Sequence, residues 1–126
     1  MAVNQADRKR IATEFLRHAK AGNRAGAEPL VAPGARHHNP YFAAGMPALL
    51  DAIVAAAKAS PGGDIQVKHI LADGDYVAVH SHVHQAKGDL GIAVVHILRF
   101  EGERIAEFWD IGQMVPADSP NKDGMF

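Results

Sequence analysis

Three histidines stand at alternate positions of one short segment: His80, His82 and His84. Side chains at alternate positions of an extended strand share a face, so the three imidazoles would project from the same side. Imidazole titrates near neutral pH and is a common metal ligand. The pattern therefore indicates one of two things: a metal-dependent site, or a polar sheet face behind which the intervening Ser81 and valines pack.

A second chemical signal combines an aspartate and a histidine. Asp110 directly follows Trp109, the only tryptophan of the chain, and His96 interrupts the apolar run 94–98. A carboxylate in an apolar site can act as a general base, and an imidazole can act as its acid partner. The same residues also fit a structural role, as a strand-end aspartate bound to a neighbouring amide and a core histidine with satisfied hydrogen bonds.

Whether His96 and Asp110 can act together depends on the hairpin that joins their strands. A two-residue loop pairs Phe100 with Ile105 and places the two side chains on opposite faces of the sheet. A three-residue loop shifts the pairing by one residue and places them on the same face. The sequence leaves both registers open.

Helices are expected to occupy the first half of the chain. Apolar residues at helical spacing predict helices over residues 5–21 and 47–60, with a short helix around 24–31 between them. Asn4 can cap the first helix and Gly22 can end it.

The stretch 32–45 is expected to be a loop. Pro40 disfavours helical geometry at Asn39. His37, His38 and Asn39 could form a lid or mouth for a site, although plain turn formation would explain the same residues.

The second half of the chain changes to an alternating pattern that predicts a sheet. Four strands are expected, over residues 65–71, 76–85, 92–100 and 104–115. Residues 116–126 are expected to form a tail, and its apolar end suggests that it docks on the protein. Helices followed by antiparallel strands give an α+β domain, with a pocket between the helices and the curved sheet.

Composition excludes several classes of function. The 126 residues are 48% hydrophobic and 21% charged, with a formal net charge of −1, which suits one globular domain and opposes binding to nucleic acid or anionic lipid. The chain has no cysteine, so disulfides, thiolate metal sites and cysteine nucleophiles are excluded. Because no secretory signal or membrane span is evident, a soluble cytoplasmic protein is expected.

Five segments are characteristic when taken together: His38–Pro40, Asp75–His82, Gly91–Val95, Arg99–Glu101 and Ile105–Asp110. They resemble the SnoaL-like polyketide cyclase group of the nuclear transport factor two-like superfamily. More narrowly, they resemble its small bacterial proteins described as predicted aldol-condensation enzymes. The resemblance extends from about residue 11 to the end and includes the tail.

The resemblance implies a fold and an assembly. The expected fold is a cone-shaped α+β domain over residues 1–126, in which three N-terminal helices pack on a strongly curved antiparallel sheet around one deep apolar pocket. Related proteins usually form homodimers through the outer sheet face. No metal or organic cofactor is expected, and the expected partner is a small molecule.

The resemblance also implies an acid–base reaction. Asp110 would remove a proton alpha to a carbonyl, and the enolate would close a carbon–carbon bond. His96, or His82 from the neighbouring strand, would donate to the developing enolate oxygen. Relatives often carry histidine at the position of Phe108 and aspartate at that of His96, so we hypothesise that His96 supplies the imidazole that is absent at position 108.

Further residues are expected to contact the substrate: His38, Asn39, Tyr41, His80 and Trp109. The function expected is a cofactor-free aldol-type cyclase, isomerase or lyase acting on a small, apolar, enolisable carbonyl compound. Two alternatives remain. One is a non-catalytic ligand-binding or dimerisation module of the same fold, and the other is a metal-dependent enzyme that uses His80 and His82.

Overall fold

The helices form largely where the sequence predicts them. The computed structural model describes residues 4–126 and contains α1 (Gln5–Lys20), α2 (Arg24–Ala27), a 3₁₀ turn (Glu28–Leu30) and α3 (Met46–Ala59). The side chain of Asn4 accepts a hydrogen bond from the backbone N–H of Asp7 at 2.8 Å, which caps α1. The short middle helix ends earlier than expected because Pro29 supports only the tighter 3₁₀ turn.

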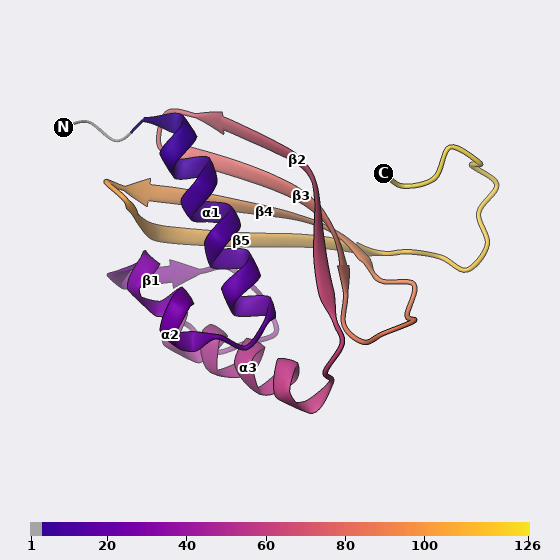
Figure 1. The fold of residues 1–126 in the computed structure, drawn as a ribbon. Helices are drawn as coiled ribbons and strands as arrows, with labels where there is room; N and C mark the ends of the chain where they lie inside the picture. The colour runs from indigo at the N-terminus through magenta and orange to yellow at the C-terminus, as the bar shows by residue number, and fades with distance from the viewer. Residues whose placement is uncertain (1–3) are drawn as a thin grey trace.

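The sheet has five strands, one more than the sequence predicts. They are β1 (Val31–His37), β2 (Asp64–Asp73), β3 (Tyr76–His84), β4 (Ile92–Glu101) and β5 (Arg104–Met114). Their spatial order is β1-β5-β4-β3-β2 (Figure 1). The four expected strands form the antiparallel part, in which β2 and β3 bend strongly towards the loop that follows β3 (Figure 1).

β1 corrects the expectation of a loop over residues 32–45. This strand pairs in parallel with β5, so the sheet is mixed rather than purely antiparallel. It contains Pro33 and Gly34, which argue against a strand, but both lie where the pairing is interrupted between Val31 and Arg36. An edge strand tolerates such an interruption, and no alternating apolar pattern marked this one.

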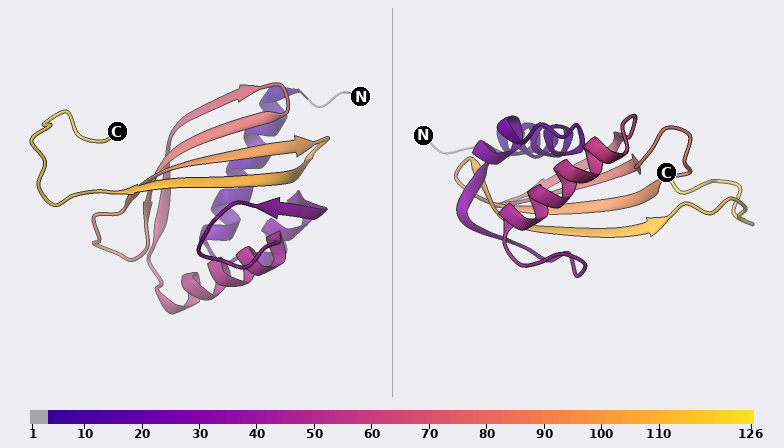
Figure 2. Two further views of the ribbon diagram at one scale, coloured as in Figure 1. Left: turned by 180° about the vertical axis from the view of Figure 1, so that it is seen from behind. Right: turned by 90° about the horizontal axis from the view of Figure 1, so that it is seen from below.

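All three helices lie on one side of the sheet, which we call the inner face; the opposite side is the outer face. Seen from behind, none of the described helices lies in front of β2–β5 (Figure 2). Phe15 of α1 meets Phe108 of β5 edge to face, with ring centroids 5.8 Å apart. These rings belong to the core between the layers, together with buried residues of α3, β3 and β4: Leu49, Leu50, Val77, Val79 and Leu98.

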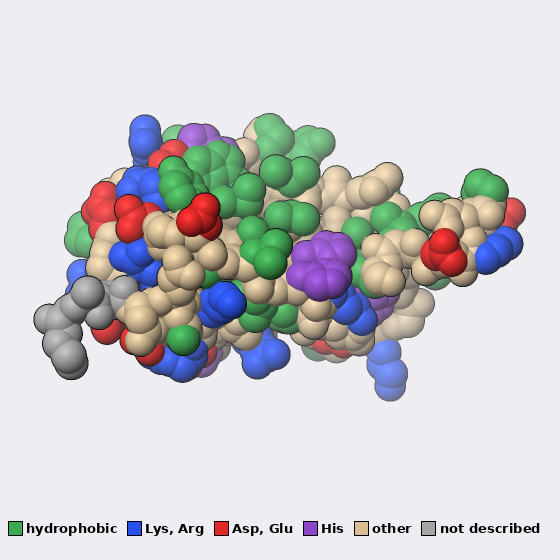
Figure 3. All heavy atoms as spheres, turned by 90° about the horizontal axis from the view of Figure 1, so that it is seen from above, with side chains coloured by type: hydrophobic (Ala, Val, Ile, Leu, Met, Phe, Trp, Pro, Cys, Tyr) green, Lys and Arg blue, Asp and Glu red, His purple; other side chains and the backbone are tan. Residues whose placement is uncertain are grey.

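The tail returns to the outer face, so it docks as expected. The ring of Phe126 stacks on His82 at 4.3 Å and on His80 at 5.7 Å between centroids. Seen from above, histidine and hydrophobic side chains are exposed on the body of the molecule, and the tail extends away beyond them (Figure 3). No helix within residues 4–126 is both long enough and apolar enough to cross a membrane.

Candidate functional site

The hairpin between β4 and β5 decides whether His96 and Asp110 share a face. Its turn has two residues, and Phe100 pairs with Ile105. A β-bulge at Ala106 then shifts the pairing by one residue, so that His96 pairs directly with Asp110. The turn is therefore that of the two-residue alternative, but the bulge gives the same-face placement that the three-residue alternative predicts.

The His96–Asp110 pair faces a cavity of about 640 Å³ on the inner face. Residues directly opposite in an antiparallel pair have Cβ atoms about 5 Å apart, so both side chains can reach one small group of a bound molecule. The wall of the cavity is mostly apolar, with contributions from Phe15, Leu16, Leu49, Ile53, Ile65, Val83, Ile92, Val94 and Phe108. The His96–Asp110 pair thus stands in a mostly apolar wall, whose other polar side chains are Lys20, Asn39, Tyr41 and Gln85.

His96 is uncharged in this environment. Burial lowers the pKa of its imidazole to about 4, although the nearby Asp110 carboxylate opposes this shift. Its Nδ1 atom is buried and has no hydrogen-bond partner among the described residues. A neutral imidazole carries one N–H donor and one acceptor nitrogen, so His96 can donate a hydrogen bond without introducing a positive charge.

Asp110 is held by the loop that follows β1. The Asn39 side chain donates from Nδ2 to Oδ2 of Asp110 at 2.9 Å, and its Oδ1 accepts from the backbone N–H of Tyr41 at 2.9 Å. No residue within 4–126 donates a hydrogen bond to Oδ1 of Asp110, so that oxygen is open to a ligand. Asn39 and Tyr41 both line the cavity, and Tyr41 is largely exposed at its mouth.

His37 holds the loop over residues 38–43 by hydrogen bonds to its backbone, a role that its position in the sequence did not reveal. Its Nδ1 accepts from the backbone N–H of Asn39 at 3.1 Å, which places the ring proton on Nε2. Nε2–H then donates to the carbonyl oxygen of Ala43 at 2.6 Å. The buried imidazole therefore ties both ends of the loop together and supports the Asn39–Asp110 hydrogen bond.

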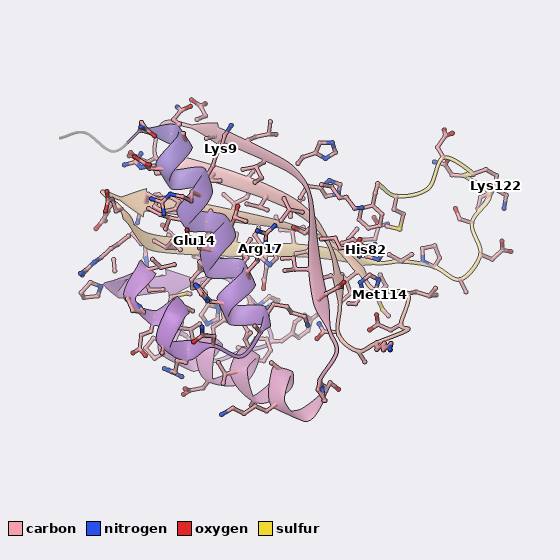
Figure 4. All side chains as sticks on the ribbon, viewed as in Figure 1. Lys9, Glu14, Arg17, His82, Met114 and Lys122 are labelled. Carbon is pink, nitrogen blue, oxygen red and sulfur yellow. The ribbon has the colours of Figure 1, made fainter. Side chains whose placement is uncertain are left out.

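The structure does not bring His80, His82 and Trp109 to the cavity. Their backbone positions alternate with inner-face residues, so they project from the outer face; His82 lies near the end of the sheet where Met114 precedes the tail (Figure 4). None of the three lines the cavity. This placement corrects the expectation that His82 donates to, and that His80 and Trp109 contact, a substrate held beside Asp110.

His38 also points away from the cavity. It stacks on Trp109 with ring centroids 5.0 Å apart, and its Nε2–H donates to Glu107 at 2.6 Å. The hydrogen bond from His38, together with that from Arg99, lowers the pKa of Glu107. The expected substrate contact of His38 is thus replaced by a place in an outer-face charge network.

Each histidine of the outer-face cluster, defined as His69, His80, His82 and His84, has a partner within the protein. The Nδ1 atoms of His69 and His80 lie 2.9 Å apart, as in a hydrogen bond between two neutral rings. His82 donates to the Leu90 carbonyl at 2.8 Å, and His84 donates to Asp64 at 2.5 Å. Within residues 4–126, no three histidine, aspartate or glutamate side chains are arranged to hold a common metal ion.

A family comparison agrees with this architecture. The model of the SnoaL-like domain matches residues 12–108, which include the three helices from Ala12 onward, most of the sheet and Phe108 in β5. No curated protein matches the sequence significantly.

Solved structures share the fold at low sequence identity. AclR from Streptomyces galilaeus, a candidate hydroxylase, is 24% identical with a TM-score of 0.74, over 88% of this chain and 81% of that one. A candidate ketosteroid isomerase from Kribbella flavida is 18% identical (TM-score 0.71; 94% and 86% covered). A candidate polyketide cyclase from Sinorhizobium meliloti is 21% identical (TM-score 0.66; 81% and 94% covered). With the family match over most of its length, the chain belongs to the SnoaL-like domain family of the nuclear transport factor two-like fold.

Proposed function

We propose that this protein is a cofactor-free acid–base enzyme that acts on a small, apolar, enolisable carbonyl compound as an aldol-type cyclase, isomerase or lyase. The observation that carries the proposal is the direct pairing of His96 with Asp110 in a mostly apolar cavity. A base and a hydrogen-bond donor on the same side of one bound molecule are what enolisation needs.

In this proposal Asp110 is the general base. Oδ2 is fixed by Asn39, which leaves Oδ1 to remove the proton from the carbon alpha to the carbonyl. The electron pair of that C–H bond forms the enolate, whose negative charge develops on the carbonyl oxygen. The apolar wall keeps water from competing for the carboxylate.

His96 is the proposed donor to the developing enolate oxygen. Because Nδ1 is buried without a partner, the tautomer with its proton on Nε2 avoids burying an unpaired N–H. A neutral imidazole suits this role since its charge need not be stabilised in the apolar cavity. It also provides an imidazole beside position 108, because the rings of His96 and Phe108 lie 5.4 Å apart.

The enolate then has two outcomes. In a cyclisation its carbon attacks a second carbonyl of the same molecule, a carbon–carbon bond forms, and the proton held by Asp110 passes to the new alkoxide. In an isomerisation the same proton returns at a different carbon. Neither course requires an oxidant, a reductant or a second substrate.

A homodimer remains part of the proposal. Leu71 and Ile111 lie on the outer face and are 68% and 61% exposed, which supports contact with a second copy. The non-catalytic alternative would use the same cavity only to hold a ligand. The metal-dependent alternative would have to assemble a site from the outer-face cluster, whose rings are already hydrogen bonded within the chain.

Deuterium exchange at the alpha carbon tests the proposal. Wild-type protein is incubated in D₂O with a panel of cyclic and aromatic ketones, and loss of the alpha-proton signal is followed by NMR. We expect Asp110→Asn to slow exchange by about 10²–10⁴-fold with an unchanged circular dichroism spectrum, while Asp118→Asn in the exposed tail exchanges normally. Equal rates in wild type and Asp110→Asn would remove Asp110 from the mechanism, and retention of a ligand without exchange would favour the binding module.

A further inference from the structure

One cation lies in the cavity wall, away from the His96–Asp110 pair. Lys20 is the last residue of α1 and is the single Lys or Arg among the described residues that line the cavity. Its side chain is half-buried, and its ammonium group donates one long hydrogen bond, of 3.4 Å, to Oε1 of Gln85. Within residues 4–126 it forms no ion pair at or below 4.0 Å, in contrast to arginines such as Arg8 and Arg99.

The carboxylates that face Lys20 are engaged elsewhere. Asp64 of β2 accepts from His84, and Asp89 accepts from the backbone N–H groups of Gln85 and Ala86. Both raise the pKa of Lys20, but the larger effect is burial, which lowers it. Lys20 has therefore lost part of its hydration without gaining a carboxylate at hydrogen-bond distance, and a bound anion would supply that partner.

The strand register places Lys20 at the opposite end of the cavity from the His96–Asp110 pair. His96 pairs with Val79, and Gln85, the partner of Lys20, follows six positions later along the same strand and its extension. Six extended residues span at most about 20 Å. The inner-face residues that line the cavity between the two ends are apolar, among them Val83 and Val94. Ser81 lies on the same face but is fully buried and does not line the cavity.

We propose that the cavity takes a carboxylate-bearing carbonyl compound, whose carbonyl lies between His96 and Asp110 and whose carboxylate binds Lys20. This inference rests on the proposed function, since it assigns the carbonyl to that pair. An elongated apolar body bridges the two polar ends. The inference thus narrows the mainly apolar carbonyl compound of the proposed function to an amphipathic keto acid, which the cavity should bind more tightly than the matching neutral ketone.

A matched pair of ligands tests the inference. 11-Oxododecanoate carries a methyl ketone and a carboxylate at opposite ends of an apolar chain, and its methyl ester lacks only the charge. Binding of each is measured by isothermal titration calorimetry to wild type, Lys20→Met and Lys58→Met. Lys58 lies in the last turn of α3, as Lys20 lies in the last turn of α1, but it does not line the cavity. Lys58→Met therefore controls for the loss of one positive charge.

We expect wild type to bind the acid about tenfold more tightly than the ester, which corresponds to about 1.4 kcal/mol. Lys20→Met should abolish this preference, and Lys58→Met should keep it. Equal affinity of wild type for acid and ester, including no measurable binding of either, would overturn the inference. A preference for the acid that survives Lys20→Met would overturn the inference as well. The role of Lys20 would then be only to stabilise the C-terminal end of α1 through the helix dipole.

Exchange of the alpha protons of the same acid separates this inference from the proposed function. Asp110→Asn should keep the preference for the acid and lose exchange. A wild type that prefers the acid but exchanges none of its alpha protons would support the Lys20 site and contradict the reaction. Exchange of the alpha protons without a preference for the acid would support the reaction and contradict the Lys20 site.

Discussion

The two faces of the sheet hold histidines in opposite circumstances. On the outer face, His69, His80, His82 and His84 cluster, and each is hydrogen bonded within the chain. On the inner face, His96 lies beside Asp110 in a mostly apolar cavity wall, with its Nδ1 unpartnered. A group whose hydrogen bonds are already made by the protein is less available to a substrate, so His96 is the stronger catalytic candidate.

The largest difference between the faces should be seen in turnover. We expect His96→Gln to reduce kcat by about 10²–10³-fold, because it removes the proposed donor to the enolate oxygen. His82→Gln should change kcat by less than about twofold, since its ring donates to the Leu90 carbonyl on the outer face. Rates are compared by alpha-proton exchange at saturating ketone, and a larger loss in His82→Gln would reverse the assignment of the two faces.

Stability at acidic pH provides the next comparison. The unfolded chain protonates His96 near its ordinary pKa of 6.5, whereas the folded protein does so near pH 4. Between these values the unfolded state binds more protons, so acidification from pH 6.5 to pH 4 should cost about 3 kcal/mol of unfolding free energy. The stabilisation that comes from keeping His96 uncharged is fully present above pH 6.5, and it is lost as the pH falls towards 4.

His96→Leu should remove that contribution, and urea denaturation at pH 7 and pH 4.5 measures it. Val94→Ala, two residues away on the same strand and also in the cavity wall, should keep the wild-type dependence. If His96→Leu loses as much unfolding free energy on acidification as the wild type does, His96 is not a buried, uncharged residue in the folded protein.

A smaller effect is expected from the loop that holds Asp110, the proposed base. Asn39→Ala removes the hydrogen bond to Oδ2 of Asp110 and should lower kcat about tenfold, because the carboxylate is no longer held in one orientation. Asn121→Ala, in the tail, serves as the matched control and should leave kcat unchanged. An unaltered rate in Asn39→Ala would mean that the cavity itself orients Asp110.

Much of this fold could be predicted from sequence, because the relevant patterns are local. The helical spacing around Phe15 and Leu49 and the alternation through His80 identify the elements within a few residues. β1 was missed because its pairing with β5 is non-local, and Pro33 and Gly34 obscure any strand pattern. The bulge at Ala106 was missed because nothing in that residue marks it, yet it puts His96 opposite Asp110.

The site was predicted only in part for a related reason. Alternation shows that His80, His82 and His84 share a face, but which face the helices cover is a property of the tertiary structure. Trp109 was expected to contact the substrate because it precedes Asp110 in the sequence. Adjacent residues of a strand point to opposite faces, however, so Trp109 lies on the outer face. Asn39 reached the site because a loop folds over the cavity, a contact that its neighbours in the chain do not encode.

The most direct test of the account is a crystal structure with 1-naphthol, a planar phenol that mimics an enolate. We expect its ring in the cavity and its oxygen about 3 Å from both the His96 imidazole and the Asp110 carboxylate. A naphthol bound on the outer face beside His80 and His82, or bound in the cavity with its oxygen away from His96 and Asp110, would contradict the assignment of the active site.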